Sequence, residues 1–217
     1  MLPIQTSQTY NNVKDYLRTH IGTQRGVDMM AAWVMSTWIV GYFDSVIGLC
    51  IRPSKKGVGA STILHTVGSI CKNPVYAHQS THNLILESLN RGCTLLVDDY
   101  SIGNEEMDAV LISGSCRRTS YVFRASEKDN RSVFIEKYSV YGPKMIVAVR
   151  PISNNPMIAS RFMTISVRQP GKARLFSTID EAEKKNLQNQ LSAWAVSFSR
   201  KMWSHGEFIY WLEAGGE

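Results

Sequence analysis

A loop rich in glycine and lysine stands between two apolar stretches in the first third of the chain. The run before it, residues 46–51, predicts a short buried strand, and Ser61 to Leu64 continues with helical spacing. Glycines allow successive backbone N–H groups to converge on an anion, and a helix N-terminus adds partial positive charge. The sequence therefore predicts a phosphate-binding loop, which comprises Ser54, Lys55, Lys56, Gly57, Val58, Gly59, Ala60, Ser61 and Thr62.

A second apolar run, Thr94 to Val97, ends in two adjacent carboxylates, Asp98 and Asp99. Carboxylates at the end of a buried strand suit a Mg²⁺ ion beside a bound nucleotide, because Mg²⁺ prefers oxygen ligands and keeps part of its water shell. The loop followed by this acidic pair predicts a site for ATP and Mg²⁺. We expect the hydroxyl of Ser61 and the carboxylate of Asp98 to hold the metal.

One residue of the usual phosphate loop is absent. The common pattern is G-x-x-x-x-G-K-[ST], in which the lysine reaches the β- and γ-phosphates. With Gly59 as the second glycine, Ser54 takes the first position and Ala60 takes the place of the lysine. The alternatives are a natural loss of the lysine and an engineered substitution that traps a bound state.

The composition indicates one globular domain. The chain has 217 residues, of which 44% are hydrophobic and 19% are charged, so it can bury a sizeable core. Its formal net charge of +6 mildly favours a polyanionic partner. The widely spaced cysteines, Cys50, Cys71, Cys93 and Cys116, are expected to be free thiols in a reducing compartment.

We expect a cytoplasmic protein with no signal peptide and no membrane contact. The one candidate membrane segment, residues 27–51, is interrupted by Gly41 and Asp44 before about 18 apolar residues accumulate. A buried helix followed by a strand fits this segment better.

The apolar periodicity predicts alternating helices and strands. Helices are expected over 7–20, 28–43, 61–70, 81–90, 105–111, 156–160 and 179–203, and strands over 46–51, 75–77, 93–97, 145–149 and 162–167. Two further runs, 119–124 and 132–140, flank a polar turn and predict a β-hairpin. Because the strands are apolar throughout and alternate with helices, they predict an α/β fold with a mostly parallel central sheet flanked by helices.

Basic residues gather on and around the predicted hairpin: Arg117, Arg118, Arg124, Lys128, Arg131 and Lys137. They are suited to contacting the phosphates of nucleic acid, and the interleaved Tyr121 and Phe123 are suited to stacking on bases. The alternatives are a solvated hairpin whose charges bind nothing and a strand whose aromatic face belongs to the core.

Six short motifs occur in a characteristic order. They are Ala32 to Trp38, Gly57 to Thr62, Leu95 to Asp99, Ser113 to Arg118 with Val122 to Arg124, Tyr141 to Lys144, and Ala159 to Phe162. Together they resemble the P-loop ATPase domain of phage, plasmid and archaeal-virus replication proteins, which is often found beside primases and looks related to the additional-strand (AAA+/RecA-like) ATPases. The resemblance covers about residues 27–170. It divides the chain into a helical lead-in (1–26), a P-loop ATPase core (27–170) and a helical extension (171–217).

The resemblance also implies roles for individual residues. Asp98 would bind the metal through water, and Asp99 occupies the position of the glutamate that orients the attacking water. Ser153 or Asn154 would sense the γ-phosphate, and Arg161 would be an arginine finger that reaches a neighbouring subunit. Lys55 to Gly59 resembles the deviant loop of partition-type ATPases, where an early lysine reaches phosphate across a dimer, although those proteins keep the later lysine as well.

Two functional hypotheses follow from the sequence. The first is the ATPase module of a replication-type helicase or translocase. It would be a homo-oligomer that acts on DNA, with single-stranded DNA favoured over duplex, and its partner would be a primase or another replication protein. The second is a catalytically impaired P-loop protein that serves as a nucleotide- or DNA-binding scaffold. Ala60 is the residue that separates them.

Overall fold

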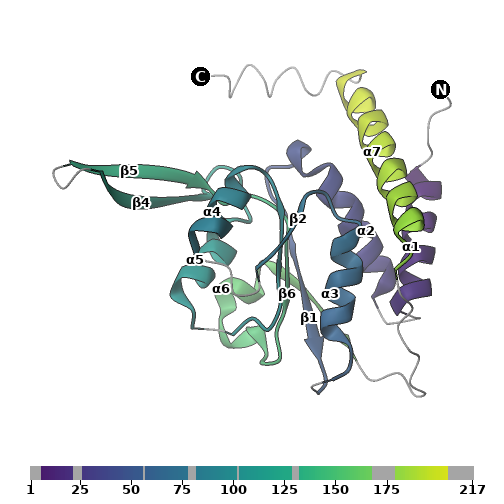
Figure 1. Cartoon of the computed structure of the whole chain (residues 1–217), viewed down its shortest axis with the longest axis horizontal. Helices are drawn as coiled ribbons and strands as arrows, with labels where there is room; N and C mark the ends of the chain where they lie inside the picture. Colours follow the sequence, from purple (N-terminus) through teal and green to yellow (C-terminus); the bar gives the residue numbers. More distant parts are fainter. Residues whose placement is uncertain are drawn as a thin grey trace.

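The protein is built on a parallel five-stranded sheet (Figure 1). The computed structural model describes residues 6–21, 26–55, 57–77, 82–101, 103–128, 132–167 and 179–204. The strand order is β2-β3-β6-β1-β7, and every neighbouring pair is parallel. The strands are β1 (Gly48–Pro53), β2 (Pro74–Tyr76), β3 (Thr94–Val97), β6 (Lys144–Val147) and β7 (Phe162–Val167). The predicted α/β fold with a mostly parallel central sheet is confirmed.

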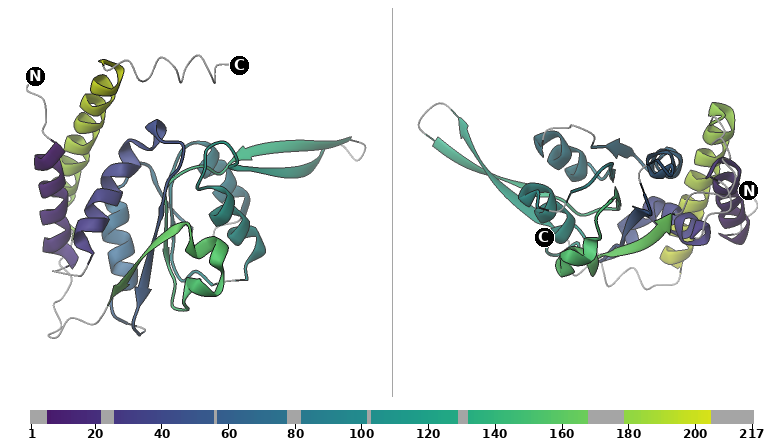
Figure 2. Two further views of the ribbon diagram at one scale, coloured as in Figure 1. Left: turned by 180° about the vertical axis from the view of Figure 1, so that it is seen from behind. Right: turned by 90° about the horizontal axis from the view of Figure 1, so that it is seen from below.

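Helices cover both faces of this sheet. They are α1 (Thr6–Ile21), α2 (Val27–Trp38), α3 (Ala60–Ser69), α4 (His82–Asn90), α5 (Glu105–Ser113), α6 (Pro156–Ala159) and α7 (Glu181–Ser204), with short 3₁₀ turns η1 (Val40–Tyr42) and η2 (Ile152–Asn154). Helices α2 and α3 lie on one face with α1 and α7 outside them, while α4, α5 and α6 lie on the other (Figures 1 and 2).

The alternation of strand side chains divides the core in two. On β3, Leu96 packs with the α1, α2, α3 and α7 side, whereas Leu95 and Val97 pack with α4, α5 and α6. Each strand therefore needs apolar residues at consecutive positions, which explains the continuous apolar runs in the sequence.

The predicted lead-in and extension lie against each other. Asn12 on α1 donates a hydrogen bond to Gln190 on α7 (2.8 Å), and the indole of Trp194 donates to Thr6 (3.1 Å). His20, which is buried, lies 3.2 Å from the carboxylate of Glu183. The two helices form one outer layer over α2 and α3.

Helix α2 ends earlier than the sequence predicts. The expected helix runs to residue 43, but α2 stops at Trp38 and continues as η1. The guanidinium of Arg117 donates to the carbonyls of Val40, Gly41 and Phe43, so backbone groups here bond to a distant side chain rather than to the next helical turn.

The predicted hairpin is present as β4 (Tyr121–Lys128) and β5 (Ser132–Ser139), inserted between α5 and β6. It begins at the amino edge of the sheet, where the parallel strands start, and projects away from the body (Figure 2). Over the ranges that the structure describes, no helix is long and apolar enough to cross a membrane. The four cysteines are free, and three of them are buried.

Candidate nucleotide-binding site

The predicted phosphate loop connects the carboxyl end of β1 to the N-terminus of α3. The amide of Ser54 donates to the carbonyl of Val167 (2.8 Å), which extends the β1–β7 ladder up to the loop. Gly57 and Gly59 adopt left-handed backbone angles (φ 79° and 85°), and such angles favour glycine. The side chain of Val58 is 3% exposed and anchors the loop in the core, while Lys55 is exposed and Lys56 lies outside the described residues.

The N-terminus of α3 opens onto this loop. Its first helical hydrogen bond runs from the amide of Ile63 to the carbonyl of Gly59 (3.0 Å), so the amides of residues 60–62 precede the helical ladder and are directed out of the helix end. Ser61 is exposed and Thr62 is half-buried. Amides and hydroxyls of this kind are suited to binding phosphate oxygens.

Ala60 points into the core. Ala60 is only 8% exposed and belongs to the apolar cluster that contains Val58 and Ile63. A lysine at this position must carry its ammonium out of that cluster to meet a phosphate. The first residue of α3 is therefore packed as a small apolar side chain.

Asp98 and Asp99 follow β3 at the same edge of the sheet as the loop. One strand, β6, separates β3 from β1, and two strand spacings amount to about 10 Å. Asp98 is half-buried, and its Oδ1 accepts a hydrogen bond from the amide of Asp99 (3.0 Å). Asp99 is exposed and has a left-handed backbone (φ 52°), which is uncommon for a residue other than glycine and occurs preferentially at functional sites.

These residues fit a nucleotide with its metal. A hydroxyl from Ser61 and a carboxylate from Asp98 are hard oxygen donors of the kind that Mg²⁺ uses with phosphates and water. The described residues contain no group of three or more acidic, histidine or cysteine side chains that could hold a metal alone. A Mg²⁺ ion here would take its remaining ligands from phosphate oxygens and water, as the ion commonly does.

A cavity of about 210 Å³ opens beside Asp98 and was not foreseen from the sequence. Its walls are Leu64 and His65 of α3, Tyr76 of β2, and Leu96 of β3. The rings of His65 and Tyr76 stack with their centroids 4.8 Å apart, and burial raises the pKa of Tyr76 to about 12. No local pattern indicates this cavity, because its walls come from three separate elements.

The predicted sensor residues lie in the connection that follows β6. Ser153 and Asn154 belong to η2 and are exposed. The next residue, Asn155, caps α6: its side chain accepts hydrogen bonds from the amides of Met157 (3.2 Å) and Ile158 (3.3 Å).

Arg161 lies at the opposite edge of the sheet. Its carbonyl accepts a hydrogen bond from the amide of Gly48 (2.8 Å), at the start of β1. The loop begins six residues later, about 20 Å along the strand, which is farther than an arginine side chain extends. Within one chain Arg161 cannot reach the phosphate loop, so a role at a nucleotide requires a neighbouring copy.

The basic residues near the hairpin occupy different environments. Arg117 is engaged at η1 and stacks on Tyr141 with its guanidinium carbon 4.5 Å from the ring centre, and Arg118 forms an exposed ion pair with Asp44 (3.6 Å). Arg124 lies opposite Glu136 in the β4–β5 ladder. The side chain of Lys128 and the whole of Arg131 lie outside the described part of the chain.

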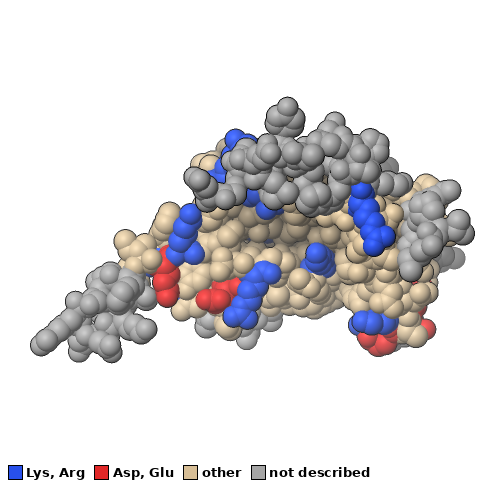
Figure 3. All heavy atoms as spheres, turned by 90° about the horizontal axis from the view of Figure 1, so that it is seen from above, with Lys and Arg blue, Asp and Glu red and all other residues tan. Residues whose placement is uncertain are grey.

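The opposite face of the hairpin is aromatic and exposed. Phe123, which is 64% exposed, stands opposite Lys137, and the ammonium of Lys137 lies 3.7 Å from the ring centre of Tyr121. The aromatic residues therefore do not belong to the core. Figure 3, which views the amino edge, shows Lys and Arg side chains at several separate places on the described part of this face rather than in one continuous patch.

Comparison with known proteins gives no family assignment. No protein-family model and no curated protein matches the chain. Two apo structures of the C-terminal region of NrS-1 align with 85% of this chain at 10% identity, with TM-scores of 0.43 and 0.41. A small-molecule complex of JCV helicase aligns with 89% of the chain at 12% identity and a TM-score of 0.34.

The chain spans less than half of the length of the NrS-1 structures, 44% and 43%, and 54% of the JCV helicase. Likenesses with TM-scores this low carry no conclusion about activity.

Proposed function

We propose that this chain is a nucleotide-binding module of the P-loop ATPase type that acts on single-stranded DNA as part of an oligomer, as a replication helicase or translocase does. The observation that carries the proposal is the shared edge of the sheet. A loop with two left-handed glycines leads there from β1 into α3, and Asp98 directly follows β3, which is the second strand from β1 in the sheet. Strand β6 lies between the loop strand, β1, and the strand that leads to Asp98, β3.

In this proposal the residues of the chain divide the work. Amides between Gly57 and Thr62 bind the phosphates, and Ser61 and Asp98 hold the Mg²⁺ that neutralises them. Asp99 orients the attacking water, with Asn154 in the sensor connection near the phosphate end. Lys55 is the described loop residue whose charge is free to approach phosphate in place of the missing lysine.

Arg161 would serve the site of the adjacent subunit. Positive charge near a transferring phosphoryl group stabilises its transition state. Because Arg161 and the phosphate loop of the same chain are about 20 Å apart, the length of β1, Arg161 could reach only the loop of another copy. An oligomer with nucleotide between its subunits is therefore part of the proposal.

The hairpin is the proposed nucleic-acid contact. Exposed aromatic rings stack on bases irrespective of sequence, and a lysine beside them pairs with phosphate. Tyr121, Phe123 and Lys137 provide this combination on one face of an arm that projects from the body.

A specific observation favours the alternative, a scaffold that binds nucleotide or DNA without turnover. Ala60 is packed in the core, so the loop is adapted to a small side chain where active enzymes use lysine. Such a protein would retain the assembly and the hairpin but lack efficient hydrolysis.

The test is ATP binding and hydrolysis by the chain with Ala60 and by Ala60→Lys, each with and without single-stranded DNA. Asp98→Ala should lose Mg²⁺-dependent binding, whereas Glu105→Ala, an exposed acidic change on α5, should keep it. Greater turnover in Ala60→Lys would identify an ATPase site limited at one position. Binding without turnover in both forms would favour the scaffold, and no binding in either would refute the nucleotide site.

A further inference from the structure

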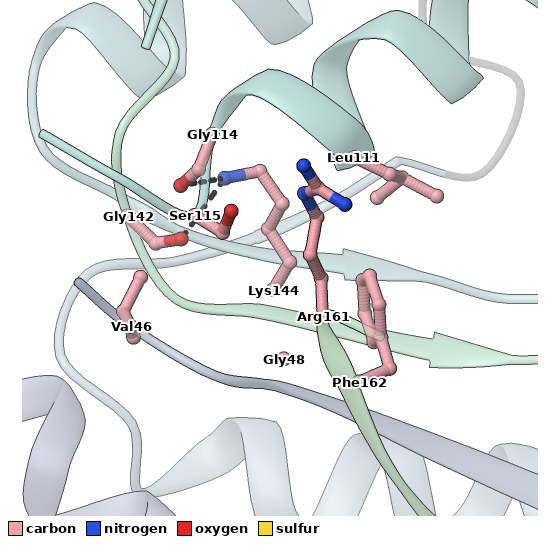
Figure 4. Close-up of a pocket in the computed structure, with 9 residues that line it drawn as sticks. All are labelled: Val46, Gly48, Leu111, Gly114, Ser115, Gly142, Lys144, Arg161 and Phe162. Carbon is pink, nitrogen blue, oxygen red and sulfur yellow. Dashed lines mark hydrogen bonds between the residues drawn. The ribbon is translucent and has the colours of Figure 1, made fainter. Parts of the chain in front are cut away.

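Lys144, the first residue of β6, is a buried lysine with no acidic partner among the described residues. Its residue is 3% exposed, and its ammonium donates to three backbone carbonyls: Val140 (2.8 Å), Gly142 (2.9 Å) and Gly114 (3.1 Å). Figure 4 shows the side chain directed to Gly114 and Gly142. Burying an ammonium costs free energy unless its N–H groups are hydrogen-bonded. The three N–H donors of Lys144 are matched by the three carbonyls.

The three acceptors lie at both ends of the hairpin. Gly114 follows α5 and leads into β4, while Val140 and Gly142 follow β5. Two backbone hydrogen bonds also connect these segments: the amide of Val140 donates to the carbonyl of Ser120 (2.8 Å), and the amide of Gly142 donates to the carbonyl of Gly114 (3.3 Å). Lys144 thus ties the outgoing and returning segments of the hairpin to the middle of the sheet.

The fit around this ammonium is close. A Cβ on Gly114 would lie 2.1 Å from Nζ of Lys144 and 2.2 Å from the carbonyl oxygen of Val140. Glycine at this position is therefore a requirement of the lysine's position, and the two residues form one unit.

Lys144 and Arg161 line the same small cavity, of about 10 Å³, together with Leu111 and Phe162 (Figure 4). Nη1 of Arg161 donates to the carbonyl of Met157 and the hydroxyl of Ser160, both in its own turn. Nε of Arg161 is buried and has no hydrogen-bond partner in the described part of the chain. An unpaired buried donor is unfavourable, and Nε of Arg161 is such a donor beside the cavity that Lys144 also lines.

We propose that Lys144 is a positioning residue that joins the base of the hairpin to Arg161, so that movement of one shifts the other. When the hairpin is displaced, the carbonyls of Gly114 and Gly142 move with the ammonium, and the wall of the Arg161 cavity changes. We call this connection between the hairpin base, Lys144 and Arg161 the joint. Its functional meaning rests on the proposed function, in which the hairpin contacts nucleic acid and Arg161 serves a neighbouring nucleotide. The joint itself requires neither ligand.

The charge state of Lys144 provides a way to observe the joint. Burial lowers the pKa of its ammonium to about 7, while the nearby Cys93 thiol, whose own pKa burial raises to about 11, acts in the opposite direction. Among the described residues, the titratable group that acts on it is this thiol, ahead of β3, and Arg161, ahead of β7, lines the same small cavity. A neutral amine has two N–H donors for three carbonyls, so one acceptor is released as the pH rises.

The experiment is an NMR titration of the full chain from pH 6 to 9 without nucleotide or DNA. We expect the amides of Ser115 and Tyr141 and the Nε–H of Arg161 to shift with one common midpoint near pH 7. In Lys144→Met, which keeps an unbranched side chain but removes the amine, this midpoint should vanish from all three. Lys72→Met, the same change at an exposed position, should leave it in place.

Titration of Ser115 and Tyr141 with a constant Arg161 signal, or no midpoint between pH 6 and 9, would refute the joint. The titration of the chain with Lys144 alone decides this if Lys144→Met does not fold. Where hydrolysis is measurable, stimulation by single-stranded DNA should fall toward onefold in Lys144→Met. A chain that binds neither ATP nor DNA would refute the proposed function, while the titration would still decide whether the joint exists.

Discussion

Replacing Gly68 by alanine tests how closely α3 must approach β3. A Cβ at Gly68 would lie 2.3 Å from Cδ1 of Leu96 and 2.8 Å from the hydroxyl oxygen of Tyr76. Leu96 is fully buried on β3, so its side chain and that of Tyr76 would have to shift toward the 210 Å³ cavity that they line. Adding a methyl group to a tightly packed core costs about 1–3 kcal/mol, whereas alanine gains about 1 kcal/mol over glycine inside a helix.

The balance predicts a net loss of up to about 2 kcal/mol in the free energy of unfolding. For a chain of this length the melting temperature should fall by about 2–4 °C per kcal/mol. Because α3 carries the phosphate loop and Leu96 lies two residues before Asp98, separating them should also weaken binding of Mg·ATP. Urea unfolding followed by circular dichroism measures the first effect, and calorimetric titration measures the second.

The matched control is Gly41→Ala. A Cβ at Gly41 meets no heavy atom within 4 Å, and its backbone is not left-handed. The change should be neutral or stabilise the fold by up to about 1 kcal/mol. If Gly68→Ala proves as stable as Gly41→Ala, then α3 can move away from β3 without cost, and the reasoning about this contact is wrong.

Three further outcomes are expected. Phe123→Ala should weaken binding of single-stranded DNA at least about fivefold, since stacking on one base contributes about 1–3 kcal/mol, and should leave the unfolding midpoint unchanged; equal affinity in fluorescence anisotropy would exclude this face. Asp99→Gly should relieve a left-handed backbone and raise stability by up to about 1 kcal/mol while abolishing hydrolysis, and a destabilised variant would contradict the strain. Lys144 has a pKa of about 7 in the folded chain against 10.5 in the unfolded chain. Above pH 7 the unfolded chain therefore binds the additional proton, and the free energy of unfolding should rise with pH by up to about 1.4 kcal/mol per pH unit. This slope should be absent in Lys144→Met when urea midpoints are compared.

Local patterns in the sequence were sufficient for the main elements of the site. Two glycines before a helical run predicted a loop in which Gly57 and Gly59 indeed have left-handed angles, because such backbone angles favour glycine. The continuous apolar run before Asp98 predicted a buried parallel strand, because only a strand covered on both faces is apolar at every position. The roles of these residues toward ATP stay predictions.

The tertiary structure decided which charged residues are free and which are engaged. Arg117 belongs to a basic run that suggests a nucleic-acid surface, yet its guanidinium bonds to the carbonyl of Gly41, 76 residues earlier. Phe123 shares one face of its strand with Tyr121, as in a core strand, yet the hairpin projects away from the sheet and leaves the ring exposed. Periodicity gives the face of a strand but not what covers that face.

The sequence by itself determined the order of elements, the parallel sheet and the position of the loop, since these depend on residues close together in the chain. Only the fold placed Arg161 at the far edge of the sheet from that loop and enclosed Lys144 among carbonyls from both ends of the hairpin. Such contacts join residues far apart in the sequence, and their geometry is set by how the strands and helices pack together.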